Sequence, residues 1–144
     1  MLRPMIQADA AAIQQLNAHD LGYDFPLPSV DEKLAEILTD TKHHLLLVYQ
    51  ESEAGVVGYV HGELYETLYA PTMVNVLALV VSKDYAKRGI GKTLLTGLEM
   101  EAAKRGIQWI RLNSGASRTA AHQFYHHLGY RMDKDQKRFI KSIG

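Results

Sequence analysis

The chain has 144 residues, of which 47% are hydrophobic and 22% are charged, which suits one folded domain and excludes disorder over most of its length. Its 16 basic residues balance 16 acidic ones, which excludes a net charge that would draw the protein to nucleic acid or to an anionic membrane. The absence of cysteine excludes disulfides, thiolate metal sites and a cysteine nucleophile.

The apolar runs of the chain are too short to cross a bilayer, the run over residues 76–81 being among the longest. The start, residues 1–4, lacks the apolar core of a signal peptide. We therefore expect a cytoplasmic protein whose partners include neither nucleic acid nor a membrane.

The N-terminal part predicts two short helices. Asp9 is placed to cap the first helix. Pro26 and Pro28 bracket an expected loop over residues 22–29. The residues Ser-Val-Asp-Glu at positions 29–32 have the pattern of a capping box, which predicts that the second helix begins there.

The middle of the chain predicts three strands, over residues 44–49, 56–64 and 73–81. Gly55 supplies the turn between the first two. Alternation along the second strand puts Tyr59, His61 and Glu63 on one face. The third strand is nearly all apolar, which predicts burial on both of its faces.

After the third strand, the apolar period changes from 2 to 3.6. The expected elements are a helix over 91–104 that ends at Gly106, a strand over 108–112, a helix over 119–127 that ends at Gly129, and a last strand over 138–140. Ser117 or a neighbour is expected to cap the last helix. The order αα-βββ-α-β-α-β predicts an α/β (α+β) protein with a mixed sheet.

Residues 79–95 carry the most informative pattern, because a buried strand leads through a basic loop into a helix that begins with glycines. Unpaired N–H groups at a helix start carry partial positive charge and hold phosphates. Gly89 and Gly91 let phosphate oxygens approach the backbone. The side chains that add charge or a hydroxyl donor there are Lys87, Arg88, Lys92 and Thr93.

Two other phosphate-binding patterns fit poorly. The Walker pattern requires a glycine five residues before Gly91, where this chain has Ala86. The dinucleotide-binding fingerprint lacks its third glycine.

Residues 86–91, Ala-Lys-Arg-Gly-Ile-Gly, resemble the signature Gln/Arg-x-x-Gly-x-Gly/Ala of the GNAT superfamily of N-acetyltransferases. Ala86 departs from the first position, which removes a side-chain contact and leaves the backbone amides. Residues 121–130 resemble a second family segment, Ala-x-x-Phe/Leu-Tyr-x-x-x-Gly-Phe/Tyr. The resemblance covers essentially the whole chain. It implies one N-acetyltransferase domain over residues 1–144, with a mixed, mostly antiparallel sheet flanked by about four helices.

The resemblance also implies that the chain binds acetyl-coenzyme A (acetyl-CoA) as its acyl donor. The residues that it assigns to the donor are Leu79, Val80, Val81, Lys87, Arg88, Gly89, Ile90, Gly91, Lys92, Thr93 and Ser117. Tyr125 matches the family's catalytic tyrosine, which stabilises or protonates the leaving thiolate.

The base that neutralises the acceptor amine is not assigned by the resemblance. Many relatives carry a glutamate on the fourth strand of the family fold, whereas residues 75–78 of this chain read Asn-Val-Leu-Ala. Asn75 as a water-ordering residue, and Glu63 or His61 on the neighbouring strand, stay open. We expect no native metal, since His122 and His126, spaced i and i+4, lack a partner carboxylate.

The expected reaction is direct attack, in a ternary complex, of a primary amine of a small molecule or peptide on acetyl-CoA. The alternative is a non-catalytic acyl-CoA-binding module or sensor. Relatives often pair, which leaves a homodimer open. The acceptor is expected near residues 21–29, residues 65–72 and the C-terminal strand. The aromatic and acidic side chains expected there are Tyr23, Phe25, Tyr65, Tyr69, Asp20, Asp24, Glu63 and Glu66.

Overall fold

The computed structural model describes all of residues 1–144. The chain divides into two compact units, unit 1 (Met1–Asn113) and unit 2 (Ser114–Gly144), and each is described by itself. Unit 1 contains β1 (Leu2–Pro4), η1 (Gln7–Asp9), α1 (Ala10–Leu16), η2 (Asn17–Leu21), α2 (Leu27–Leu38), β2 (His44–Glu51), β3 (Gly55–Thr67), β4 (Ala70–Val81), η3 (Lys83–Tyr85), α3 (Ile90–Lys104) and β5 (Ile110–Leu112). Unit 2 contains α4 (Thr119–His127).

The strands of unit 1 form one five-stranded sheet in the order β1-β2-β3-β4-β5. The first three pairings are antiparallel, and β5 runs parallel to β4 after the crossover through α3. The predicted α/β (α+β) class with a mixed, mostly antiparallel sheet is therefore confirmed. The short strand β1 was missed, because three residues carry no readable alternation.

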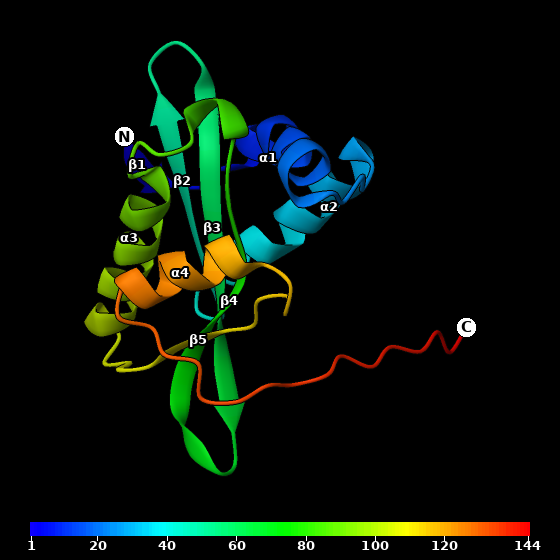
Figure 1. The fold of residues 1–144 in the computed structure, drawn as a ribbon. Coiled ribbons are helices and arrows are strands. Elements are labelled where there is room, and N and C mark those ends of the chain that lie inside the picture. Colours follow the sequence, from blue (N-terminus) through cyan, green and yellow to red (C-terminus); the bar gives the residue numbers. More distant parts are fainter. The chain divides into compact units, whose positions relative to one another are not determined.

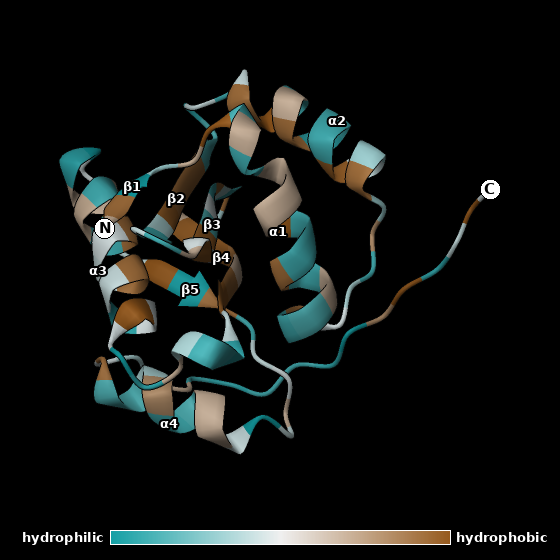
Figure 2. Ribbon diagram, turned by 90° about the horizontal axis from the view of Figure 1, so that it is seen from above, coloured by the Kyte–Doolittle hydropathy of each residue, from teal (hydrophilic) through white to brown (hydrophobic).

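Helices cover both faces of this sheet, with α1 and α2 on one side and α3 on the other (Figures 1 and 2). The alternation of β3 explains the division. The Tyr59 hydroxyl reaches Asn17 in η2, directly after α1, whereas a side chain at Gly62 would come within 3.0 Å of Leu98 in α3. None of the helices combines the length and the apolar composition that a transmembrane span requires.

The helix α3 buries the stripe that its sequence predicts. Leu94, Leu95 and Leu98 are fully buried, and Ala102 is 2% exposed. Burying each leucine contributes about 2 kcal/mol of hydrophobic free energy. Gly106, at φ 74°, ends the turn after the helix as expected.

The start of α2 lies earlier than predicted. The helix begins at Leu27, inside the expected loop over residues 22–29, with Pro26 as its N-cap residue. Pro28 does not interrupt it, because the first turn of a helix needs no donor from its backbone nitrogens. The predicted capping box over residues 29–32 is therefore wrong.

The carboxylate of Asp9 has another role than the predicted helix cap. It accepts hydrogen bonds from both terminal nitrogens of Arg3, at 2.8 and 2.9 Å, and from the amide of Ile6 at 2.8 Å. No side-chain bond caps α1. Asp9 instead joins β1 to the first helical turn, across a contact that a local sequence pattern does not reveal.

Unit 2 forms the predicted helix, and Gly129 lies at φ 92° after it. Arg118, rather than Ser117, is the N-cap residue, and no side chain caps the helix. The predicted last strand over residues 138–140 is wrong, since no strand forms there and Phe139 is 91% exposed. A strand needs a neighbour for its main-chain groups, and unit 2 contains no strand that could serve.

Candidate functional site

The edge of β4 is open at its C-terminal half. The parallel pairing with β5 joins Val74 to Ile110, Asn75 to Arg111 and Val76 to Leu112, and β5 ends there. Residues 77–81 continue β4 without a partner on this side. Their main-chain groups are therefore available to a ligand that lies along the strand as a further strand would.

A β-bulge decides which amides of β4 face this open edge. His61 pairs with Ala78 and Gly62 with Val76, so that Leu77 is an extra residue on β4. Leu77 is 49% exposed, so the predicted burial of the strand on both faces is wrong at this position.

The directions of two hydrogen bonds locate the outward amides. The amide of Val74 donates to the carbonyl of Trp109, beside β5, whereas the amide of Ser82 donates to Val57 on β3. Main-chain groups alternate along a strand, so these two opposite directions require the extra residue between them. Counting back from Ser82, the N–H groups of Leu79 and Val81 point to the open edge. Val80 points the other way, toward β3, and its side chain is buried in the core.

The amides at the start of the loop after β4 are hydrogen-bonded to β3 and to η2. Besides the bond from Ser82 to Val57, the amide of Lys83 donates to the carboxylate of Asp20 at 3.0 Å. Asp20 was predicted as an attractor for an ammonium group. In the structure it instead holds η2 against the start of this loop.

The next stretch of the loop leaves a row of amides unpaired. The amide of Ala86 donates to Lys83 and that of Thr93 to Gly89, but the amides of residues 87–92 donate to no protein acceptor. Lys87, at φ 62°, and Gly89, at φ 77°, adopt the left-handed conformation on either side of Arg88. Alternating backbone conformations of this kind make concave, anion-binding amide clusters. The backbone therefore fits a phosphate without any special side chain.

The side chains of the loop contribute unequally. Lys87, Arg88 and Lys92 are all exposed, and the guanidinium of Arg88 lies 4.7 Å from the centre of the Tyr85 ring. The Thr93 hydroxyl, predicted as a donor to the phosphate, donates to the Gly89 carbonyl at 2.9 Å in this structure. Ile90 is 3% exposed and offers only its amide.

A second group of polar side chains lies on three neighbouring strands, β3, β4 and β5, near the end of the pairing between β4 and β5. The Asn75 amide nitrogen donates to Glu63 at 3.0 Å, and Arg111 donates to the Asn75 amide oxygen at 2.7 Å. The ring of His43 lies 3.3 Å from the other Glu63 oxygen. Arg111 also lies over the ring of Tyr65, 4.4 Å from its centre.

A pair of histidines lies on the same face of the sheet. The imidazoles of His44 and His61 are hydrogen-bonded at 2.9 Å. Burial lowers the pKa of His61 to about 4, and burial also lowers the pKa of His44. Both rings are neutral at pH 7, and His61 has too little affinity for a proton to neutralise an ammonium group.

The predicted catalytic residue Tyr125 lies on α4, in unit 2. Its ring packs edge-on against Phe124 and Tyr130, with ring centres 5.3 and 6.0 Å away. Burial raises its pKa above the ordinary value, and the charge of Arg118 opposes this shift. The phenol therefore keeps its proton at neutral pH and is able to donate it in a hydrogen bond.

Other predicted residues of unit 2 have local contacts. The Ser117 carbonyl accepts from the amide of Thr119, and the side chain of Ser117 is exposed. His122 contacts the carbonyl of Gly115 at 2.9 Å, and His126 contacts that of Tyr130 at 3.1 Å.

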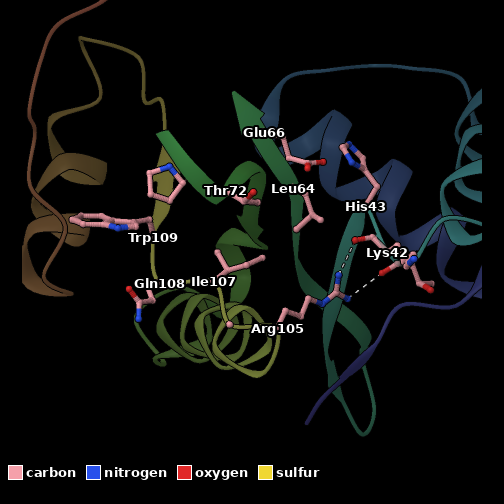
Figure 3. Close-up of a pocket in the computed structure, with 12 residues that line it drawn as sticks. Lys42, His43, Leu64, Glu66, Thr72, Arg105, Ile107, Gln108 and Trp109 are labelled. Atoms are coloured by element: carbon pink, nitrogen blue, oxygen red, sulfur yellow. Dashed lines mark hydrogen bonds between the residues drawn. The ribbon is translucent and has the colours of Figure 1, made fainter. Parts of the chain in front are cut away.

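An open depression of about 830 Å³ lies at the other end of α3 (Figure 3). Leu64, Glu66 and Trp109 are among its lining residues, and Arg105 closes one side by donating to the carbonyls of residues 41 and 42. The 15-residue helix separates it from Gly89 by about 22 Å. Glu66 therefore lies in a different surface region from the loop that precedes α3.

The aromatic residues predicted near the acceptor are separated in the structure. Tyr23 and Phe25, before α2, are 69% and 50% exposed. Tyr69 is 83% exposed in the tight turn between β3 and β4, whereas Tyr65 is held beneath Arg111. Only Tyr65 belongs to the polar group around Asn75.

Comparisons with known proteins agree with this fold. The sequence profile of the acetyltransferase (GNAT) family matches residues 10–130. A transcriptional regulator from Bacillus halodurans C-125 is 22% identical at a TM-score of 0.85, over 98% of this chain and 99% of that chain. The aminoglycoside antibiotic 6'-N-acetyltransferase AAC(6')-IG from Acinetobacter haemolyticus is 14% identical at 0.83, over 100% and 99%. AAC(6')-Iy, solved with the bisubstrate analogue CoA-S-monomethyl-acetylneamine, is 14% identical at 0.85, over 99% and 97%. At these identities the structures are similar in fold alone.

Proposed function

This chain belongs to the GNAT acetyltransferase family, and we propose that it transfers an acetyl group from acetyl-CoA to a primary amine by direct attack in a ternary complex. The single observation that carries the proposal is the open edge of β4 running into the unpaired amides of residues 87–92. A long donor molecule with an acyl thioester at one end and a pyrophosphate in its middle matches this sequence of features.

In this proposal, residues 1–144 act as one N-acetyltransferase domain. The pyrophosphate binds the amides of residues 87–92, with Lys87, Arg88 and Lys92 adding positive charge. The pantetheine arm follows β4, where the outward N–H groups of Leu79 and Val81 are free to bind its carbonyl groups. An N–H aimed at the thioester oxygen stabilises the oxyanion that forms on attack.

The chemical step follows from these positions. The acceptor ammonium loses a proton to water, and the free amine forms a C–N bond to the thioester carbon. The C–S bond then breaks, the thiolate of coenzyme A leaves, and the new amide nitrogen gives up its extra proton to water. Tyr125 is assigned as the hydrogen-bond donor to that thiolate, by the family resemblance of residues 121–130 and by the raised pKa that keeps its phenol protonated.

Two observations favour a second candidate, a module that binds acyl-CoA without catalysis. Asn75 stands where many relatives of the family carry a glutamate, and Ala86 replaces the first residue of the loop signature. In that case the amides of residues 87–92 would still bind the donor, and no amine would be acetylated.

Two parallel measurements separate the two candidates. Release of coenzyme A thiol is measured from acetyl-CoA with a panel of primary amines that includes an aminoglycoside, a polyamine, an amino acid and a lysine peptide. Thermal unfolding is followed in parallel with acetyl-CoA or ATP, because a ligand stabilises the state that it binds. Thiol release that depends on an amine supports the enzyme. Stabilisation by acetyl-CoA without thiol release supports the module, and stabilisation by ATP alone contradicts both.

A further inference from the structure

Glu63 on β3 and Asn75 on β4 are directly paired in the antiparallel ladder. Paired residues of neighbouring strands put their side chains on the same face of the sheet. Tyr59 shares this face of β3 by alternation, and its hydroxyl reaches Asn17 after α1. The two side chains therefore lie on the α1 and α2 side of the sheet, opposite α3.

Arg111 determines how the side chain of Asn75 is oriented. A guanidinium has donors only, so the amide of Asn75 must present its oxygen to Arg111, which it does at 2.7 Å. The amide nitrogen is then directed to Glu63, to which it donates at 3.0 Å. Arg111 itself is held by the Tyr65 ring and by Asn113. These contacts hold the carboxylate of Glu63 beside the side chain of Asn75.

The carboxylate of Glu63 is held but remains accessible. One oxygen accepts from Asn75, and the other lies 3.3 Å from His43. The side chain of Glu63 is 26% exposed, so a ligand is able to reach it. No arginine or lysine contacts either oxygen directly, which leaves the negative charge without a direct cationic partner other than a protonated His43.

The separation from the donor edge is suitable for an acceptor amine. Val60, which pairs with Leu79, lies three residues from Glu63 along β3, or about 10 Å at the usual strand rise. The reacting nitrogen and a water molecule fit within this span. His61, which lies between Val60 and Glu63 along β3, is hydrogen-bonded to His44.

We propose that Glu63 is the anionic residue that binds the ammonium group of the acceptor, and that Asn75 and Arg111 hold it in place. The inference rests on the proposed function and names its acceptor class, a primary amine that is cationic at neutral pH. Glu63 thereby supplies, from β3, the carboxylate that β4 lacks at Asn75.

The first test compares two kinds of acceptor with the variant Glu63→Gln. For a cationic alkylamine, KM should rise tenfold or more, because the charge attraction is lost. For an aromatic amine, which is uncharged at neutral pH, KM should change less than threefold. KM for acetyl-CoA should stay the same. Glu53→Gln, the same change in the exposed turn between β2 and β3, is the matched control and should match the wild type.

The second test moves the carboxylate across the strand pair, in the double variant Glu63→Gln/Asn75→Asp. Its side-chain charge is the same as in the wild type. The amide introduced on β3 is able to donate to the carboxylate introduced on β4, and that carboxylate is able to accept from Arg111. The double variant should recover at least a third of the lost kcat/KM for the alkylamine. Near-wild-type melting temperatures for both variants would show that folding is intact.

The outcomes separate this inference from the function on which it rests. A wild-type protein that acetylates no amine contradicts the proposed function, and the inference falls with it. An active wild type combined with unchanged alkylamine kinetics in Glu63→Gln contradicts the inference alone. An equal loss of kcat/KM with both acceptors would also contradict the inference, since that result indicates a structural role for Glu63.

Discussion

Val76 pairs with Leu112 at the last rung between β4 and β5, and beyond this rung only β4 continues. The bulge at Leu77 follows immediately and turns the amides of Leu79 and Val81 to the side that β5 has left. The end of one strand and the extra residue in its neighbour together produce the open edge. The bulge and the unpaired end of β4 precede the glycine loop along the chain and lead into it.

The conformation of Gly89 gives a prediction for donor binding. Gly89→Val should reduce acetyl-CoA affinity tenfold or more, because a β-branched residue resists the left-handed backbone at φ 77° and shifts the amides of the loop. Isothermal titration measures the affinity. Gly106→Val is the matched control, with φ 74° and equally open surroundings. Both variants should lose about 1–2 kcal/mol of stability, and only Gly89→Val should lose affinity. Equal affinities in the two variants would remove the loop from the donor site.

The phenol of Tyr125 gives a prediction for turnover. Tyr125→Phe should lower kcat about 100-fold, the usual scale of proton or hydrogen-bond donation, and should leave acetyl-CoA affinity within threefold. Steady-state kinetics and titration measure the two quantities. Tyr49→Phe on β2 serves as the control and should keep full activity. Unchanged kcat in Tyr125→Phe would contradict the assigned role.

Burial of Tyr59 predicts a loss of stability at high pH. Its pKa is raised to about 12 because the ionised phenolate would be poorly solvated. Its proton is held more tightly in the folded state, so its stabilisation is complete below pH 10 and is lost as the pH rises to about 12. The difference of about 2 pKa units corresponds to about 3 kcal/mol. Denaturant unfolding of the wild type and Tyr59→Phe should show this loss in the wild type alone.

The ion pair of Asp9 predicts the opposite pH dependence. Burial raises the pKa of Asp9, but hydrogen bonds from Arg3 and Ile6 and the charge of Arg3 outweigh it, so the pKa lies below the ordinary value. The stabilisation is therefore present above about pH 4 and disappears as the pH falls through the lowered pKa. Asp9→Asn should cost about 3 kcal/mol at pH 7 and progressively less as the pH falls below about 4. Asp133→Asn, at an exposed position, should change neither value.

The sequence predicted those elements whose pattern is long and local. The stripe of α3, the bounds of α4 and the face shared by Tyr59 and Glu63 are confirmed, because periodicity over several turns or strand residues determines each. The three-residue strand β1 and the bulge at Leu77 were not found. Both depend on pairing with another strand, which no local pattern encodes.

Long-range contacts also explain the corrected polar residues. Asp9 had the local pattern of a helix cap, yet it accepts hydrogen bonds from Arg3 on β1. Asp20 had that of a substrate attractor, yet it accepts a hydrogen bond from the amide of Lys83, after β4. Conversely, Glu63 and Asn75 were separate alternatives in the sequence, and the strand register brings them into one hydrogen-bonded group. The spacing of two residues in the sequence does not reveal which strand positions face each other.

Hydrogen–deuterium exchange with and without acetyl-CoA tests the central claim most directly, since it reports on individual segments of the backbone. Saturating acetyl-CoA should slow exchange in peptides that cover residues 77–92, where the open edge and the unpaired amides lie. Residues 70–76, which already pair with β3 and β5, should change little, and ATP should leave both segments unchanged. Unchanged exchange over residues 77–92 at saturating acetyl-CoA would contradict the account.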